Sequence, residues 1–224
     1  MALCPAAVWP GGGQAAGGFC EREERPVKGE SSPTLYTRRL ILRRFTPADR
    51  EALLDIYGDR EVNTFLPWFP ISTLEEADAL FAARYEAAYR QPGGYRYALC
   101  RRADDRPIGY LHLEGEGAHD FGYALLRPFW GRGYATEAGR AVLERARADG
   151  VPFVTATHDR QNPASGRVMQ RLGMVYRYSY REQWQPKDLM VVFRLYQLNF
   201  TCPEDRVYRG YWEQYSEHFV EKGL

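Results

Sequence analysis

The positions of apolar residues divide the chain from residue 34 onward into strand-like and helix-like segments. Apolar and polar residues that alternate are typical of strands, and apolar residues spaced three and four apart are typical of amphipathic helices. Helix-start signals support the assignment, such as Thr46 before Pro47 and the pair Ser72 and Thr73. The expected strands are 35–45, 95–100, 108–113, 121–126, 153–157, 175–180 and 189–200, and the expected helices are 46–57, 72–90, 135–148 and 163–172.

Both ends of the chain differ from this regular pattern. Residues 1–33 are rich in Gly, Ala, Pro and Glu without periodicity, which predicts a flexible N-terminal extension. A start codon assigned too far upstream would give the same composition. The last strand is long enough that we expect a bend or bulge within it. Residues 201–224 predict a helical tail packed on the domain of residues 34–200, because aromatic side chains recur there at helical spacing: Tyr208, Tyr211, Trp212, Tyr215 and Phe219.

Composition narrows the class of protein. The 224 residues include 30 basic and 29 acidic side chains, a formal net charge of +1, so we expect no nucleic-acid or membrane partner. No apolar run reaches the roughly 18 residues of a membrane span, and no signal peptide is expected. Widely spaced cysteines favour reduced thiols in the cytoplasm over disulfides or zinc: Cys4, Cys20, Cys100 and Cys202. Whether the chain is a monomer or a homodimer is left open.

The segment from Trp130 to Glu137 carries the clearest chemical signal. It is glycine-rich and lies between an expected strand and an expected helix. Such a turn places several backbone N–H groups at a helix N-terminus, where they bind anions. Gly131 and Gly133 allow the main chain to approach the ligand closely and to take positive φ. The sequence therefore predicts a phosphorylated ligand.

Two familiar phosphate loops fit this segment poorly. A P-loop requires Lys-Ser or Lys-Thr after its second glycine, and neither pair follows here. The dinucleotide fingerprint requires a third glycine, and Thr136 stands in that register. The expected strands and helices also lack the repeated βαβ units of a dinucleotide-binding domain.

A third possibility explains more of the chain. Trp130 to Ala135 resembles the R/Q-x-x-G-x-G/A loop of the GNAT N-acetyltransferases, whose amides hold the pyrophosphate of acetyl-CoA. The resemblance covers about residues 35–200 and is closest to the RimJ/RimL-like branch, the ribosomal-protein N-terminal acetyltransferases. Further matching segments are Gly122-Tyr-Ala-Leu125, Tyr134-Ala-Thr-Glu-Ala138, Asn162-Pro-Ala-Ser165, Leu172-Gly-Met174 and the start Leu40-Ile-Leu-Arg-Arg-Phe45 with Thr46-Pro-Ala-Asp49.

The resemblance implies a fold and a cosubstrate. The fold would be α/β (α+β), with a mixed, mostly antiparallel sheet of about six to seven strands and helices on both faces. Acetyl-CoA would be the cosubstrate, and no metal would be required. Two positions depart from the family: Trp130 replaces Arg or Gln, and Met169 stands where many relatives carry a tyrosine acid. The implied cofactor-binding residues are Leu125, Leu126, Gly131, Arg132, Gly133, Tyr134, Ala135, Thr136, Asn162 and Ser165.

Acetyl transfer to an amine requires a neutral amine and a stabilised thiolate leaving group. By resemblance, Asp120 faces the acceptor and is the candidate base, acting through water; the alternative is a surface ion pair or a strand-end cap. We expect its replacement to matter most at low pH, where the amine is hardest to deprotonate. Ser165 is the candidate donor to the departing sulfur, or else a helix-start serine. Asn162 could orient pantetheine or cap the helix.

Metal binding is an alternative chemistry for the same region. His112, Glu114, Glu116, His119 and Asp120 contain metal-ligand side chains. His112, Glu114 and Glu116 would share a strand face only if the strand continued through Gly115 and Gly117, which favour a turn, so no metal site is expected. His119 stays an alternative base because its usual pKa suits proton transfer at neutrality.

The acceptor is the least defined part. Aromatic residues in segments that line the family's acceptor cleft could bind a cationic amine or a peptide, or could be ordinary packing: Trp68, Phe69, Tyr178, Tyr180 and Trp184. The sequence predicts direct attack in a ternary complex, since no Cys lies in the motif segments. The leading acceptor is a protein N-terminal amine. The alternatives are a small amine (aminoglycoside, polyamine or amino-acid derivative) and a CoA-binding sensor without turnover.

Overall fold

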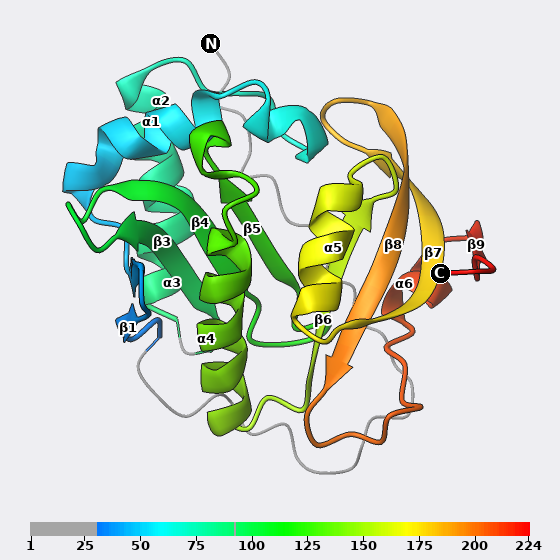
Figure 1. The fold of residues 1–224 in the computed structure, drawn as a ribbon. Coiled ribbons are helices and arrows are strands. Elements are labelled where there is room, and N and C mark those ends of the chain that lie inside the picture. The colour runs from blue at the N-terminus through cyan, green and yellow to red at the C-terminus, as the bar shows by residue number, and fades with distance from the viewer. Residues whose placement is uncertain (1–30, 92) are drawn as a thin grey trace.

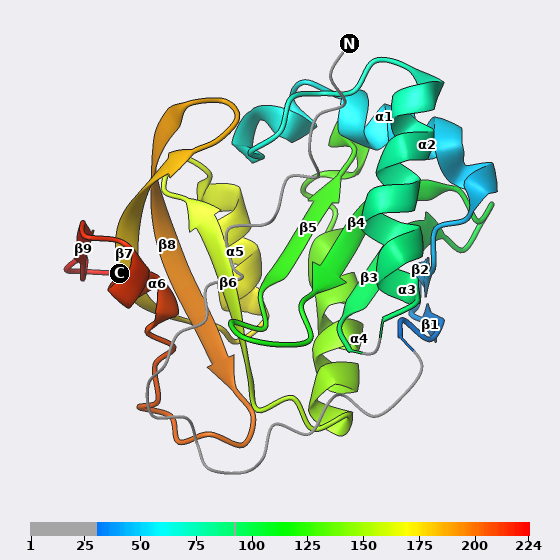
Figure 2. The same cartoon turned by 180° about the vertical axis from the view of Figure 1, so that it is seen from behind.

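The computed structural model describes residues 31–91 and 93–224, in which two sheets carry helices on both faces (Figures 1 and 2). The first sheet is antiparallel throughout, in the order β1 (Leu35–Tyr36), β2 (Leu40–Arg43), β3 (Tyr95–Arg101), β4 (Pro107–Leu113) and β5 (Phe121–Leu125). The second is also antiparallel, in the order β6 (Phe153–Asp159), β8 (Leu189–Asn199), β7 (Val175–Trp184) and β9 (His218–Phe219).

One face of the first sheet is covered by the helices that precede β3. They are α1 (Arg50–Gly58), α2 (Leu74–Phe81) and α3 (Ala87–Tyr89), and a π-helical turn, Ala82–Glu86, joins the last two. The opposite face is covered by α4 (Tyr134–Ala148), with α5 (Pro163–Arg171) beside it over the junction with β6. Each face has its own apolar core, so the strands of this sheet are buried on both sides.

The two sheets meet at one end of β5 and β6. A single parallel bridge joins Asp120 to Thr155, and the Thr155 hydroxyl donates to the Ala118 carbonyl at 2.7 Å. Beyond this point the two strands diverge (Figures 1 and 2). The β6-facing edge of β5, Phe121–Leu125, therefore has no strand partner among the described residues, and its outward N–H and C=O groups face the region of divergence.

Helix starts follow the sequence signals. The Thr73 side chain accepts a hydrogen bond from the Glu76 amide, and the Glu76 carboxylate accepts one from the Thr73 amide, which is a capping box at the start of α2. Asn162 caps α5 in front of Pro163. The expected helices 135–148 and 163–172 are confirmed within a residue at each end.

Several boundaries differ from the expected ones. The expected strand 35–45 is two strands, because a turn at Thr37 returns the chain through a bond from the Thr37 amide to the Leu40 carbonyl. The irregularity expected in the last strand lies in its neighbour β7, between Tyr176 and Tyr178. None of the helices in residues 31–91 and 93–224 has the length and apolar character to cross a bilayer.

The two ends of the chain pack differently from the expectation. Residues 1–30 of the expected extension lie outside the described residues, whereas Ser32 is buried and its hydroxyl accepts from the Arg96 amide at 2.8 Å. In the expected helical tail, only α6 (Gly210–Gln214) is helical. The chain then pairs as β9 with β7, because the edge of β7 offers unpaired backbone groups.

Candidate functional site

The glycine-rich turn opens helix α4 in a backbone conformation that side chains disfavour. Gly131 has φ +69° and Gly133, the residue before the helix, has φ +78°. Only glycine takes these angles without strain. The amides of the first turn of α4 have no partner within the helix and can bind an anion. The Thr136 hydroxyl in this turn is buried and has no hydrogen-bond partner among the described residues.

Arg39, from the turn before β2, supports this loop. Its Nη1 donates to the Arg132 carbonyl at 2.9 Å, and its Nε binds Glu137 Oε2 at 2.6 Å. The guanidinium also lies 4.3 Å from the centre of the Tyr134 ring, a cation–π contact. The sequence motif contained Glu137 but did not indicate Arg39, because its partners lie more than 90 residues away in the chain.

The last residues of β5 are tied to the loop and to β4. Trp130 Nε1 donates to the Leu125 carbonyl at 2.6 Å, which gives the tryptophan at the family's Arg or Gln position a structural role. The Leu126 amide donates to the Ile108 carbonyl at 2.9 Å, so it belongs to the sheet rather than to the open edge. The outward amides along β5 are those that alternate with the amides paired to β4, and the last of them belongs to Leu125.

Two hydroxyl groups meet where α5 begins. The Ser165 amide donates to Asn162 Oδ1 at 3.3 Å, so Asn162 is the N-cap. Ser165 Oγ and Tyr123 Oη lie 3.1 Å apart. Met169 is fully buried one helical turn further on, where its thioether donates no proton. Tyr123 lies in the matched sequence segment, but no role follows from the sequence alone, and only its partner on α5 reveals one.

Asp120 lies on the opposite side of β5 from Ser165. Side chains alternate along a strand, so Asp120 shares its face with Gly122, whereas Tyr123 points to α5. Asp120 is 9% exposed, and its carboxyl lies 3.9 Å from His112 Nε2. Burial raises the pKa of Asp120 to about 7, and the Arg96 charge opposes this only in part.

The His112 imidazole fits above Gly122. A Cβ at Gly122 would lie 2.3 Å from the imidazole Cε1, so a larger residue there would displace the ring. Burial lowers the pKa of His112 to about 3, so the ring beside Asp120 is neutral at physiological pH. His119, the alternative base, packs edge-on against Phe153 with ring centres 5.1 Å apart.

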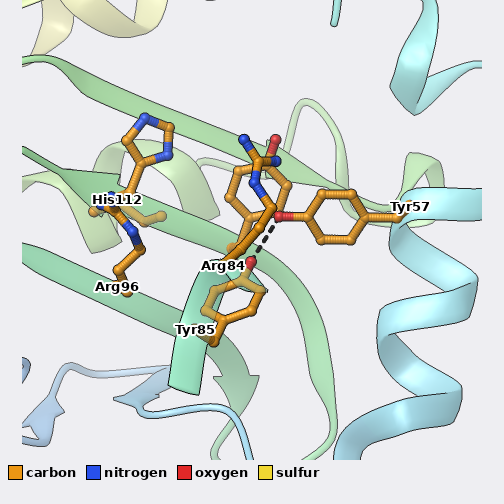
Figure 3. A pocket seen from close by; sticks show the side chains of 7 residues that line it. Tyr57, Arg84, Tyr85, Arg96 and His112 are labelled. Atoms are coloured by element: carbon orange, nitrogen blue, oxygen red, sulfur yellow. Dashed lines mark hydrogen bonds between the residues drawn. The ribbon is translucent and has the colours of Figure 1, made fainter. Parts of the chain in front are cut away.

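A pocket lies on the Asp120 face of the sheet, under α1 and the π-helical turn (Figure 3). The Tyr57 and Tyr85 hydroxyls point toward each other at 2.7 Å, and Tyr57 stacks on Tyr110 at 5.1 Å. Arg84 lies 4.0 Å above the ring of Trp68, which places this predicted acceptor residue beside the pocket. The pocket is lined by Tyr57, Arg84, Tyr85, Arg96, Tyr110, Leu111 and His112.

The other predicted acceptor aromatics belong to a separate apolar cluster between the second sheet and the tail. Tyr178 is 2% exposed, and its hydroxyl donates to the Tyr208 carbonyl at 2.9 Å. Trp184 packs on Phe193 at 4.8 Å between ring centres. Tyr180 stacks on Tyr215. Phe69, by contrast, is 62% exposed. Trp68 thus packs against the apolar cluster that contains Tyr57 and Tyr110, whereas Tyr178, Tyr180 and Trp184 belong to a different one.

A second buried carboxyl, which the sequence did not indicate, lies in this cluster. Glu182 is 7% exposed on the same face of β7 as Tyr180 and Trp184. Burial raises the pKa of Glu182 to about 7, although a hydrogen bond with Tyr215 acts to lower it. Both Glu182 and Asp120 act electrostatically on the Tyr180 hydroxyl, so the two carboxyls approach it from different strands. Within residues 31–91 and 93–224, no cluster of three or more metal-ligand side chains is present.

Comparisons with known proteins agree with this geometry. Residues 39–175 match the family model described as an acetyltransferase (GNAT) domain. The uncharacterized N-acetyltransferase YoaA of Bacillus subtilis is 27% identical over 146 residues, which span 63% of this chain and 82% of that protein.

Solved structures share the fold. A GNAT-family acetyltransferase from Bacillus anthracis aligns with a TM-score of 0.63 at 20% identity, over 75% of this chain and 99% of that one. RimL, described as a ribosomal L7/L12 alpha-N-protein acetyltransferase in complex with coenzyme A, aligns with a TM-score of 0.65 at 17% identity, over 76% of this chain and 100% of that one.

Proposed function

The chain belongs to the GNAT acetyltransferase family and is an N-acetyltransferase, and from that premise we propose that it acetylates the N-terminal amine of a protein. The observation that carries this acceptor is the raised pKa of Asp120, about 7. A general base works best when its pKa lies near the working pH, and the pKa of Asp120 does so at neutrality. An α-ammonium has a usual pKa of about 8 and a lysine ammonium one of about 10.4, so near neutral pH such a base deprotonates an α-amine at the smaller free-energy cost.

The binding residues fit acetyl-CoA as the donor. The amides of Gly131 to Ala135, with the buried Thr136 hydroxyl, would receive the pyrophosphate, and Arg132 would add a positive charge at the rim. The open edge of β5 up to Leu125 would run beside pantetheine, with Leu126 anchoring its end in the sheet. Asn162 and Ser165 would lie near the thiol end, at the start of α5.

The proposed base, Asp120, and the proposed hydrogen-bond donor to the leaving thiolate, Ser165, would approach the acetyl group from opposite faces of β5. Asp120, through a water molecule, would take the proton of the attacking amine on one face. The amine nitrogen forms a bond to the acetyl carbon, and the carbon–sulfur bond breaks with its electron pair on sulfur. The Ser165 hydroxyl would stabilise the thiolate from the other face. No enzyme acyl intermediate is needed, because the amine attacks directly in the ternary complex.

RimL supports the assignment to the RimJ/RimL-like branch, because its described activity is on a protein α-amine. Trp68 would then border the acceptor's path beside the pocket, whereas Tyr178 and Trp184, which are buried in the cluster under the tail, would support its wall from behind. We place the reaction in the cytoplasm, in the protein as a monomer or homodimer. A small amine that carries an anion, such as an amino-acid derivative, is the second candidate, since Arg84 and Arg96 line the pocket beside His112.

An acceptor screen tests the proposal. The full chain is given acetyl-CoA and three matched sets: peptides with a free N-terminus, the same peptides blocked there but containing lysine, and small amines. Thiol release and product mass are measured. We expect turnover with the first set only. Turnover restricted to small amines would replace the leading acceptor by the second candidate, and tight acetyl-CoA binding without any turnover would indicate a CoA sensor.

A further inference from the structure

The hydroxyl pair of Tyr123 and Ser165 lies at the open edge of β5. Tyr123 comes from the middle of that strand, and Ser165 from the first turn of α5, 42 residues later. The two oxygens are 3.1 Å apart, which is hydrogen-bond distance. The pair therefore bridges the strand and the helix on the side of β5 where the proposed function has the thiol depart.

The direction of this hydrogen bond follows from acidity. Either hydroxyl could donate on geometry alone. A phenol is a far stronger acid than an aliphatic alcohol, so Tyr123 is the better donor and Ser165 Oγ the better acceptor. Burial raises the pKa of Tyr123 to about 12, although the hydrogen bond with Ser165 acts to lower it. The phenol therefore keeps its proton throughout the physiological pH range.

The Ser165 hydrogen is then free to point elsewhere. Asn162 already caps the Ser165 amide, so the serine hydroxyl is not needed for capping α5. Once Ser165 Oγ accepts from Tyr123, its own hydrogen turns away from the phenol and is available to another acceptor. Met169, on the same face of α5 one turn later, offers no competing donor.

We propose that Tyr123 is a positioning residue that orients the Ser165 O–H toward the leaving thiolate. This rests on the proposed function. When the carbon–sulfur bond breaks, its electron pair goes to sulfur and the Ser165 hydrogen bonds to it. Tyr123 keeps its own proton, and the thiolate is protonated by solvent after release, so no charge is left on the pair.

The direct test is the pKa of the CoA thiol when bound to the protein, read from the ultraviolet absorbance of the thiolate. A donor aimed at sulfur lowers that pKa. We expect wild type to lower it, and Tyr123→Phe and Ser165→Ala each to return it toward the value of free CoA. The double variant should match the single ones, because both substitutions break the same chain of hydrogen bonds.

Activity gives a second readout once an acceptor is known. We expect Tyr123→Phe to lower kcat roughly tenfold, the effect of losing one charge-assisted hydrogen bond, with KM for acetyl-CoA nearly unchanged. Tyr97→Phe is the matched control, because it also removes one tyrosine hydroxyl from the first sheet, one that donates to the Pro33 carbonyl at 2.9 Å. It should leave both readouts unchanged.

The outcomes separate the two proposals, because the thiol titration needs no acceptor. If wild type and Tyr123→Phe bind CoA with equal thiol pKa, the role of Tyr123 is overturned and the proposed function stands. If Tyr97→Phe shifts the thiol pKa as much as Tyr123→Phe, the effect is a general one on the sheet and the role is again overturned. Failure of wild type to bind CoA would overturn the donor assignment itself.

Discussion

Arg39 and Glu137 join the first hairpin of the chain to the helix that carries the glycine loop. The Arg39 Nε and the Glu137 Oε2 are 2.6 Å apart, and the same carboxylate accepts from the Thr37 hydroxyl and the Arg39 amide. Burial alone would raise the pKa of Glu137, but these hydrogen bonds outweigh it and hold the pKa below its usual value. The loop is thus held by the turn before β2 as well as by its own glycines.

Arg39→Ala should therefore weaken acetyl-CoA binding although Arg39 belongs to no motif. It removes the donor to the Arg132 carbonyl and the partner of Glu137, so the loop amides lose their fixed geometry. We expect the dissociation constant to rise about tenfold by calorimetry, the cost of one charged hydrogen bond. Arg106→Ala is the control, because it removes an exposed ion pair with Asp55. Equal affinities for both variants would contradict a bracing role.

Gly133→Val should abolish acetyl-CoA binding. It should destabilise the fold by little more than the matched substitution Gly150→Val. Gly150, at the other end of α4, also has positive φ, +87°, and a Cβ there meets nothing within 4 Å. Left-handed backbone costs a side chain about 1–2 kcal/mol. Gly133→Val and Gly150→Val should lower the melting temperature by similar amounts. Only Gly133→Val should lose affinity, and comparable affinity losses in both variants would count against the loop.

The loop was predictable from sequence because its determinants are local. Two glycines between a strand and a helix fix the position of the amides whatever packs around them. The same holds for the capping residues Thr73 and Asn162, which act within three residues of themselves. Element types were therefore predicted well along most of the chain, and the family followed from the order of such local segments.

Relationships between distant residues were not predictable in the same way. Periodicity assigns a side chain to a face but does not name the residue opposite it, so Arg39, Tyr123 and Glu182 were missed. It also does not report burial. The sequence predicts Asp120 as a candidate base but does not indicate that its environment includes the tail tyrosines Tyr208 and Tyr211, about 90 residues later, on whose hydroxyls its charge acts.

Burial of Asp120 reverses the pH dependence expected from sequence. With a pKa of about 7, Asp120 is protonated at low pH and becomes a base only as pH rises through 7. Asp120→Asn should therefore lower kcat/KM most above pH 7, by about a hundredfold, and remove the rise in kcat/KM near neutrality. Steady-state rates from pH 5.5 to 9 measure this, with the exposed Asp55→Asn as control. A rise that persists in Asp120→Asn would remove Asp120 from the mechanism.

Glu182 gives the fold itself a pH dependence. Its pKa is raised to about 7 in the folded chain, by burial, from a usual value of 4.5. Between these pH values the folded chain holds a proton that the unfolded chain has lost. The free energy of unfolding therefore falls as pH rises from 4.5 to 7, and it stays lower above pH 7.

Glu182→Gln should remove this fall in the free energy of unfolding. At pH 8 the variant should be more stable by up to about 3 kcal/mol, raising the melting temperature by about 6 °C or more, and near pH 5 the gain should be small. Thermal unfolding at both pH values checks this against Glu217→Gln, whose exposed carboxylate should give no gain at either. An equal gain at pH 5 and pH 8 would show that the stabilisation comes from packing and not from the charge of Glu182.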